Sequence, residues 1–553
     1  MKEGFRQAMA WLHTWSGLVL GWVLFAMFLT GTLAYFRPEI TLWMQPEVQR
    51  SAVSSEDAAT TALTFLAQRA PDAVRWQISL PDERDPLLKL FWHKPTPEGE
   101  APRGRRGTGR RGTGRRGNFG NAVLDPATGA ELKARETRGG DFFYRFHFEL
   151  QLNYPWGRWL ASIAAMAMLI AIVSGIIPHK KFFKDFFTFR PQKGGQRASL
   201  DAHNITGVLA LPFNLMITYS GLVIFMHMVM PVAIVAAYDS PQQFFDELFP
   251  SRAELAAAGV AAPLAPIAPI APMLRQAGEQ FDGAGSGRLV VDRPLDANAR
   301  VTIYPNSDRR VTYYRGEGLT FDGVSGELRS TPGPESAAAI ATGLMYGLHM
   351  GHFAGAPLRW LYFLCSLAGT AMVATGLLLW AVKRRRQHAA LERPHFGLRL
   401  VDSLNLATIA GICVATAVFF WANRLLPAEL AGRSGWEVRA FFSAWGLALL
   451  HALLRPSRRG WMEQLVVAAA LFCALPLLNA FTTDVHLGAS LPAGDWVRAG
   501  FDLTAFVTGL LLAWCAWKAG RPRQPLPRRE KQARRAAPAS SSLPEADSAS
   551  QPA

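Results

Sequence analysis

Two segments of this 553-residue chain place a histidine at the start of a long apolar run. In each segment one glycine follows the histidine by four residues, and another follows it by eighteen. The residues are His13, Gly17 and Gly31 in the first segment, and His203, Gly207 and Gly221 in the second. A metal-binding imidazole is costly inside a membrane and indicates function there. The spacing therefore predicts two related membrane helices, each opening with a functional histidine.

A second pair of histidines repeats in the same way. Each lies ahead of an Arg-Trp-Leu tripeptide, and a glycine follows the tryptophan by sixteen residues inside another apolar run. The residues are His147, Arg158, Trp159, Leu160 and Gly175 in the first case, and His349, Arg359, Trp360, Leu361 and Gly376 in the second. Residues 1–200 and 201–390 are thus predicted to be two copies of one unit. Each copy is a helix, a large extramembrane segment and a helix.

Half of the chain is hydrophobic, and the apolar residues are concentrated in runs. Eight runs reach the ~20 residues that cross a bilayer core as a helix. They span residues 9–36, 157–178, 203–237, 357–382, 403–425, 436–454, 461–480 and 496–517. A signal peptide is an alternative for the first run, but that run is too long and lacks a small-residue cleavage site. The fold class predicted is a polytopic α-helical membrane protein with about eight transmembrane helices.

Basic residues in the loops indicate the orientation, because they gather on the cytoplasmic side of a membrane. Basic clusters follow the second, fourth, sixth and eighth runs, at residues 180–197, 383–386, 455–459 and 518–535. All four fall on one side if both termini are cytoplasmic. Residues 37–156 and 238–356 are then outside, in the periplasm of a two-membrane bacterium. The sequence predicts a multi-pass inner-membrane protein.

Two low-complexity pieces supply most of the net charge of +16. Residues 101–124 hold seven arginines and no acidic residue, and the tail from Lys518 is also basic. Such a composition cannot bury a core and predicts disorder. The positive charge is therefore assigned to topology and linkers, and no nucleic-acid partner is expected.

Each outside segment reads as a helix followed by strands. A helix is expected at 58–67 and another at 273–280. Strands are expected at 75–80, 87–92, 122–124, 287–292, 300–304 and 311–314. Both segments then reach a turn of the form Asp-x-x-Ser/Thr-Gly, at Asp125 to Gly129 and at Asp322 to Gly326. Such turns are typical of hairpins, so two α+β modules are predicted.

The domain organisation predicted from these features has eight parts. They are helix 1 (1–36), an outer module with the Arg/Gly-rich insertion (37–156), helix 2 and a basic loop (157–200), helix 3 (201–237), a second outer module (238–356), helix 4 (357–390), four additional helices (391–517) and a disordered basic tail (518–553).

The order and duplication of these motifs resemble the PepSY-associated transmembrane family. The resemblance is carried by the His-x-x-x-Gly helix start, the Asp-x-x-Thr-Gly module end and the histidine before Trp-Leu, over about residues 5–385. In particular, the chain is similar to the inner-membrane ferric-siderophore reductases of Gram-negative bacteria. The resemblance implies periplasmic PepSY-like modules and an Fe(III)-siderophore as substrate. The Arg/Gly-rich insertion departs from the usual first module, and the four C-terminal helices lie outside the resemblance.

The predicted topology places His13 and His203 at the cytoplasmic ends of their helices, and His147 and His349 at the outer ends. An axis along the membrane normal would bring each equivalent pair together. Two facing imidazoles are the axial ligand set of a bis-His haem. Because the chain has no Cys-x-x-Cys-His, two non-covalent haems of the b type are predicted, with these four histidines as iron ligands.

Other histidines compete for these roles. A lone histidine at a helix end is commonly an interfacial or hydrogen-bonded side chain. Here four histidines occur as two repeat-related pairs, and this favours haem binding. His352, three residues after His349, and His227, 24 residues after His203, are rival cofactor-binding residues on the outer side. His451 and His486, in or beside the additional helices, could serve a quinone.

Two haems near opposite faces of the membrane predict a path for electrons. The path leads from the cytoplasmic side to an Fe(III)-siderophore outside, with release of Fe(II) for iron uptake. No dinucleotide-binding glycine motif follows a strand, so the donor is a separate reductase, a diffusing reductant or a quinol. Two further classes stay open: a non-redox permease, and a regulatory or assembly protein whose outer modules bind a partner. The siderophore and the oligomeric state also stay open.

Overall fold

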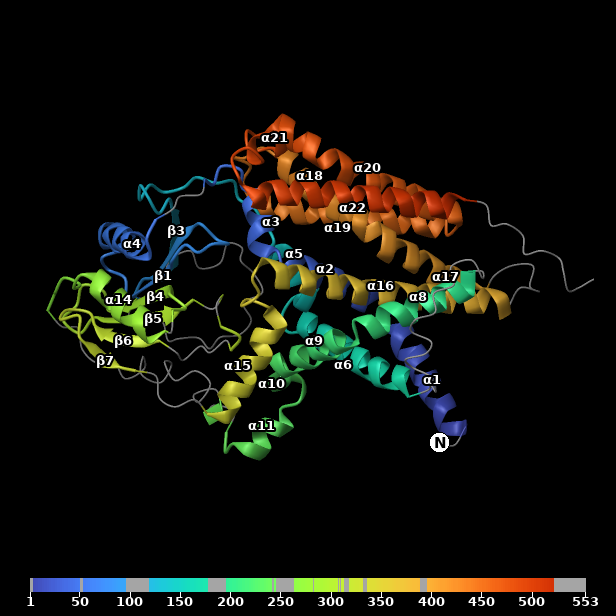
Figure 1. The fold of residues 1–553 in the computed structure, drawn as a ribbon, viewed down its shortest axis with the longest axis horizontal. Helices are drawn as coiled ribbons and strands as arrows, with labels where there is room; N and C mark the ends of the chain where they lie inside the picture. The colour runs from blue at the N-terminus through green and yellow to red at the C-terminus, as the bar shows by residue number, and fades with distance from the viewer. Residues whose placement is uncertain are drawn as a thin grey trace, which may run out of the picture.

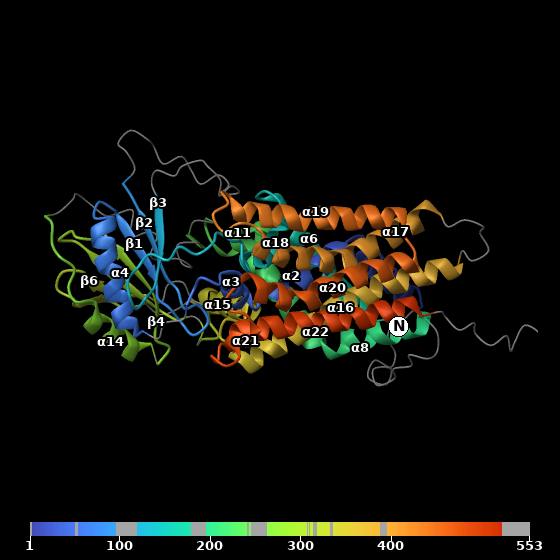
Figure 2. The ribbon, with the colours of Figure 1, turned by 90° about the horizontal axis from the view of Figure 1, so that it is seen from above.

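The computed structural model describes residues 3–49, 53–95, 119–177, 195–240, 243–244, 263–281, 283–306, 308, 310–312, 318–331, 336–387 and 395–521. Most of the Arg/Gly-rich insertion, the basic loop at 178–194 and the tail from 522 lie outside these residues. A β-sheet with its helices occupies one end of the molecule, and a large helical bundle occupies the other (Figure 1). Figure 2 shows that the long helices of the bundle run roughly along the same direction.

The chain passes between the bundle and the sheet twice, in the same order of elements. The first passage comprises α1 (Glu3–Val19), α2 (Gly21–Ala34), α3 (Arg37–Met44), α4 (Ser55–Arg69), β1 (Arg75–Ser79), β2 (Leu88–His93), β3 (Phe119–Leu124), α5 (Asp141–Glu149) and α6 (Trp156–Ile176). The second comprises α8 (Gly195–Leu209), α9 (Leu211–Ile224), α10 (Met226–Val229), α11 (Val232–Ala237), α14 (Ile270–Gln280), β4 (Ser286–Asp292), β5 (Arg300–Pro305), β6 (Leu319–Asp322), β7 (Leu328–Ser330), α15 (Ala337–Met350) and α16 (Ala356–Gln387).

A C-terminal group of helices completes the bundle. It comprises α17 (Phe396–Leu406), the π-helical turn η2 (Ala407–Gly411), α18 (Ile412–Leu425), α19 (Arg433–Leu454), α20 (Arg458–Thr482), α21 (Leu487–Ser490) and α22 (Trp496–Gly520). Helices α17, η2 and α18 form one continuous apolar span of 30 residues.

Within the described residues, six helices are long and apolar enough to cross a membrane, and two bent pairs bring the number to eight if each pair is one span. The protein is therefore a multi-pass membrane protein. The bent pairs correct the expectation of straight first and third helices, because α1 and α2 meet at 65° and α8 and α9 at 66°. The second elements begin with Gly21 and Leu211-Pro212. Proline removes a helical N–H group, and glycine weakens a helix, so both favour a break there.

The strands form one antiparallel sheet in the order β3-β2-β1-β4-β5-β6-β7. The first strand of each passage lies at the centre, where β1 pairs with β4 from Arg75 opposite Asp292 to Ser79 opposite Arg288. An ion pair between Arg75 and Asp292 links β1 and β4 at one end of the pairing. Helices α4 and α14 cover one face and bury a shared core that includes Trp76, Ile78, Leu289 and Val291. The sheet with α4 and α14 is called the sheet unit below.

The two Asp-x-x-Ser/Thr-Gly turns form as the sequence predicts. The side chain of Asp125 accepts hydrogen bonds from the backbone N–H groups of Ala127 and Thr128, and Asp322 does the same for Val324 and Ser325. Gly129 and Gly326 adopt positive φ angles of 70° and 80°, which glycine tolerates best. Of the strand expected at 311–314, Val311 and Thr312 form a bend instead, and Tyr313 and Tyr314 lie outside the described residues. The described strand that pairs with β5 on this side is β6.

A pair of cysteines, one on β1 and one on β4, tests whether these two strands are neighbours in the sheet. Gln77 and Val290 are directly opposite, and opposite Cα atoms of antiparallel strands are ~4.5–5.5 Å apart, within reach of a disulfide. Gln77→Cys with Val290→Cys should therefore cross-link under mild oxidation, as measured by mass spectrometry of unreduced peptides. Gln77→Cys with Thr302→Cys, one strand further away, is the control. Equal cross-linking of both pairs would contradict the strand order.

Candidate functional site: two histidine pairs between helices

The structure brings the four histidines together in the two pairs that the sequence suggests. The ring centres of His13 on α1 and His203 on α8 are 6.1 Å apart, and those of His147 on α5 and His349 on α15 are 6.0 Å apart. Two imidazoles that bind one metal ion from opposite sides place their ring centres about 6 Å apart, given metal–nitrogen bonds of about 2 Å. His147 and His349 form the sheet-side pair, and His13 and His203 form the far-side pair.

Each ring is held through its Nδ1 atom. The Nδ1–H groups donate to the carbonyl oxygens of Ala171 (from His13), Met372 (from His203) and Met27 (from His147), each at 2.8 Å. The Nδ1 of His349 lies 3.0 Å from the Ser220 hydroxyl oxygen. Because that hydroxyl donates to Met216, it accepts from the ring. These hydrogen bonds select the tautomer in which Nε2 is the ligand nitrogen.

A glycine on a neighbouring helix makes room for every ring. A Cβ atom added at Gly31 would lie 2.7 Å from His147, and one at Gly221 would lie 2.9 Å from His349. The same holds for Gly175 with His13, at 2.9 Å, and Gly376 with His203, at 3.1 Å. The sequence singled out Gly17 and Gly207 as well, but Gly17 faces open space and Gly207 lies against Met372. The close approach therefore depends on the later glycine of each run.

An apolar cavity adjoins each pair. The sheet-side cavity measures about 490 Å³ and the far-side cavity about 360 Å³, both within the range of small-molecule sites. Leu24 and Met168 line both cavities, so the two adjoin. Along α6, Ser162 lines the sheet-side cavity and Ala171 binds His13, which separates the two sites by roughly 14 Å of helix.

Two tyrosines also line the sheet-side cavity, and sequence reasoning missed them. Tyr144 and Tyr346 each precede the histidine of their helix by three residues and reach the same cavity. The signal was present, because α5 and α15 share the pattern Tyr-x-x-His. One basic side chain lines each cavity as well, Arg158 on the sheet side and Lys383 on the far side.

The rival histidines take other positions. His227 lies on the short helix α10 and lines the sheet-side cavity together with His147 and His349. The bend between α8 and α9 changes only the path by which the chain reaches it from His203. Burial and the charges of Arg84, Arg37 and Arg359 lower the pKa of His352 to about 4. His451 contacts Glu463 and Gln464, and His486 caps α21.

The comparison with known proteins rests on the region that holds both pairs. The model of the PepSY-associated TM region matches residues 10–383. The chain belongs to the PepSY-associated transmembrane family. An uncharacterized protein of Pseudomonas aeruginosa is 26% identical over 404 residues, which cover 70% of this chain and 96% of the relative. The PepSY-associated match contains all four paired histidines and ends before α17.

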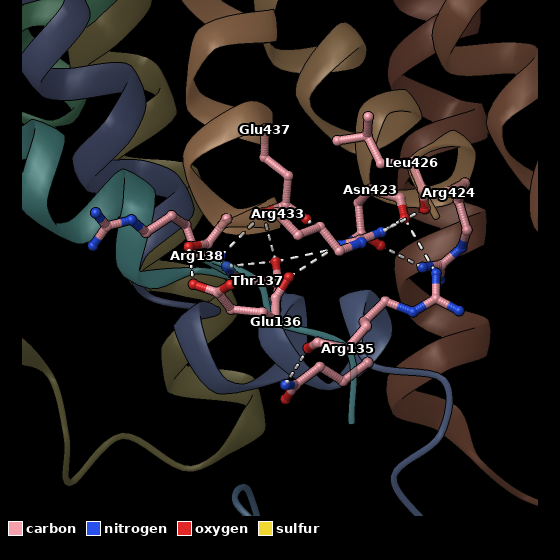
Figure 3. A network of polar contacts seen from close by, with 12 residues as sticks. Arg135, Glu136, Thr137, Arg138, Asn423, Arg424, Leu426, Arg433 and Glu437 are labelled. Atoms are coloured by element: carbon pink, nitrogen blue, oxygen red, sulfur yellow. Dashed lines mark hydrogen bonds and ion pairs between the residues drawn. The ribbon is translucent and has the colours of Figure 1, made fainter. Parts of the chain in front are cut away.

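A buried polar network lies in the C-terminal helices, outside the PepSY-associated match. Arg433 and Glu437 form a fully buried ion pair at 2.7 Å, and Asn423 and Arg424 on α18 extend the network (Figure 3). In the sequence, this network is indicated only by charged residues that lie inside or beside apolar runs. Among the described residues, no group of three or more His, Cys, Asp or Glu side chains could hold a metal ion.

Filling the space beside one ring should destabilise the protein. Gly31→Ala would force the His147 ring or its helix to move, and overpacking of this kind costs about 1–3 kcal/mol. Gly446→Ala, in α19 and with nothing within 4 Å, is the matched control and should keep or raise stability. Thermal unfolding in mild detergent measures the difference, and equal melting temperatures would contradict the close packing.

The lowered pKa of His352 predicts an acid-dependent loss of stability. The folded protein resists protonation of a group whose unfolded pKa is near 6.5, so stability falls as the pH drops from about 6.5 towards 4. His352→Gln should therefore raise stability at pH 5 by up to ~2 kcal/mol and change little at pH 8. His395 is exposed, so His395→Gln is the control. An equal gain in the stability of His352→Gln at pH 5 and pH 8 would count against the explanation.

Proposed function

We propose that this chain is a haem-containing inner-membrane reductase that delivers electrons to a periplasmic Fe(III)-siderophore and releases Fe(II) for iron uptake. The observation that carries the proposal is the presence of two facing histidine pairs about 6 Å apart between helices. In this proposal the sheet unit is periplasmic, both termini are cytoplasmic, and the electron donor is a reductase, a diffusing reductant or a quinol.

The residues of both sites suit a haem of the b type. The two facing imidazoles of each pair would hold the iron, and the hydrogen bonds at Nδ1 leave Nε2 of each ring as the nitrogen that would bind it. The four glycines leave clearance beside the rings, and the cavities are apolar. Arg158, which pairs with Glu149 in the structure, and Lys383 would place positive charge at the cavities, where it could bind the carboxylates of such a group.

We further propose that residues 1–390 are two copies of one unit and that the sheet unit consists of two PepSY-like modules. The support is the equivalence of position: each copy supplies a histidine to each pair, a bend of about the same angle and a central strand of the sheet. A pseudo-two-fold axis between β1 and β4 would account for the paired histidines, the paired bends and the paired central strands.

Bound haem supplies a site that takes up and passes on one electron at a time. The chain's own residues hold and tune that site. The Nδ1 hydrogen bonds fix each imidazole and raise the electron density at Nε2. Leu24 and Met168 line both cavities and make the place where the cavities adjoin apolar. The substrate approaches the sheet-side pair, and each ferric ion accepts one electron there, which weakens its binding by hard oxygen ligands.

A non-redox permease is the second candidate, and one observation favours it. Helices broken within the membrane often line a substrate path in transporters, and α1/α2 and α8/α9 are broken pairs. In the reductase proposal the same breaks have another use, because they let one run supply a histidine to the far-side pair and a glycine to the sheet-side pair.

The visible spectrum of the purified protein separates these candidates. In mild detergent we expect sharp α and Soret bands in the reduced-minus-oxidised spectrum and two haems per chain. His147→Ala and His13→Ala should each lower the haem content by about half, since each removes an axial ligand from one site. His352→Ala is the control and should keep both haems. The reduced protein should then be reoxidised by a ferric siderophore, with Fe(II) captured by a ferrous chelator.

Two results would contradict the proposal. A protein that stays colourless when haem is supplied would favour the permease. Equal haem loss in His352→Ala and His147→Ala would contradict the assignment of the sheet-side ligands.

A further inference from the structure

The C-terminal helices lie outside the family match, yet they contact the helix that carries His147. We propose that they act as a clamp on α5 and that Glu437 is a positioning residue for His147. The role of His147 rests on the proposed function, whereas the contacts of the clamp stand independently of it.

Helix α5 has two differently occupied faces. Phe142, Phe143 and Phe146 are buried and pack against aromatic residues of α18 and α19, with ring centres 4.6 Å apart for Phe142 and Phe419. Tyr144, His147 and Phe148 line the sheet-side cavity. Helix α5 also packs on α2, whose Met27 carbonyl accepts from His147, and on α6. The aromatic contacts with α18 and α19 therefore hold α5, and with it the His147 ring, from the opposite face.

Glu437 holds the segment that leads directly into α5. Its fully buried carboxylate accepts four hydrogen bonds (Figure 3). Two donors belong to the C-terminal helices, Asn423 Nδ2 and Arg433 Nη1, both at 2.7 Å. The other two precede α5, Thr137 Oγ1 at 2.8 Å and the Arg138 backbone N–H at 3.0 Å. A buried carboxylate with every donor in place fixes geometry more strongly than apolar packing alone.

A second contact of the clamp acts on α3, which also supports α5. The indole N–H of Trp43 donates to Asp502 at 2.9 Å, and the Trp43 carbonyl accepts from Arg424 at 2.5 Å. Two residues earlier on α3, the Thr41 hydroxyl oxygen accepts a hydrogen bond from the backbone N–H of Gly140, the residue that caps α5. The Glu437 contacts and the α3 contacts therefore both hold the start of α5.

The other ligand of the pair is held differently. α15 is capped by its own Ser336 and packs chiefly on α9, which also supplies Ser220 to His349. Glu437 thus acts on one histidine of the sheet-side pair. The C-terminal helices meet the far side through a separate contact, in which Val401 of α17 packs with Leu18 and Leu377 beside that cavity. Because the groups that orient a ligand tune the metal it binds, Glu437 would influence the sheet-side haem through His147.

Glu437→Gln tests this inference, because it keeps the shape of the side chain and replaces one acceptor oxygen with a donor. Two measurements are made on the full-length protein in detergent. The first is hydrogen exchange of residues 137–149 compared with residues 337–350. The second is a redox titration that resolves the two haems. Glu463→Gln is the matched control, since Glu463 lies in the same group of helices and pairs with His451 and Arg455 at half-exposed positions.

We expect Glu437→Gln to speed exchange in 137–149 on the order of tenfold, to leave 337–350 unchanged and to shift the midpoint potential of the sheet-side haem alone. Thr137→Val, which removes a single donor, should give a smaller change in the same direction and serves if Glu437→Gln does not fold. Unchanged exchange would overturn the clamp, and faster exchange with both potentials unchanged would overturn the positioning of His147. A wild-type protein without haem would overturn the proposed function alone, because the exchange data still decide whether Glu437 holds α5.

Discussion

The arrangement depends on one constraint: an imidazole can enter the space between membrane helices only where a neighbouring helix makes room for it and offers a hydrogen-bond acceptor. All four paired histidines meet both conditions, with a glycine beside each ring and an oxygen atom at each Nδ1. An unpaired N–H group would be costly in an apolar surrounding. The acceptor therefore stabilises the ring and also fixes which nitrogen faces the partner histidine.

The bends in α1/α2 and α8/α9 follow from this constraint. Each broken run carries a histidine before the break and, eighteen residues later, the glycine that faces a histidine of the other pair. A bend of about 65° changes the direction of the run between these two residues. Gly31 and Gly221 can then lie against the sheet-side rings while His13 and His203 lie in the far-side cavity. One broken run thus serves both sites.

Much of the fold could be predicted from the sequence, because the periodicity and repetition of residue types indicate local structure. The apolar runs, the helices α4 and α14, most strands and both Asp-led turns follow from patterns that act over a few residues. The pairing of His13 with His203 and of His147 with His349 followed from duplication, although their role as iron ligands stays a prediction. The bend in the first run could not be predicted, because Gly21 matters through its contact with Leu377, 356 residues away in the sequence. The strand expected at 311–314 does not form at Val311 and Thr312, although both residue types favour strands, and β6 begins only at Leu319.

The C-terminal helices show most clearly what a sequence conceals. Arg433 and Glu437 are four residues apart on α19 and would read as an ordinary surface ion pair, which contributes little to stability. In the structure the pair is fully buried, and its carboxylate also binds Thr137 and Arg138 from a segment some 300 residues earlier. A buried charge is tolerated only when every donor and acceptor is matched. The match requires the first passage of the chain and the C-terminal helices to be folded against each other, so the extra helices are integrated with the histidine sites and are more than an independent appendage.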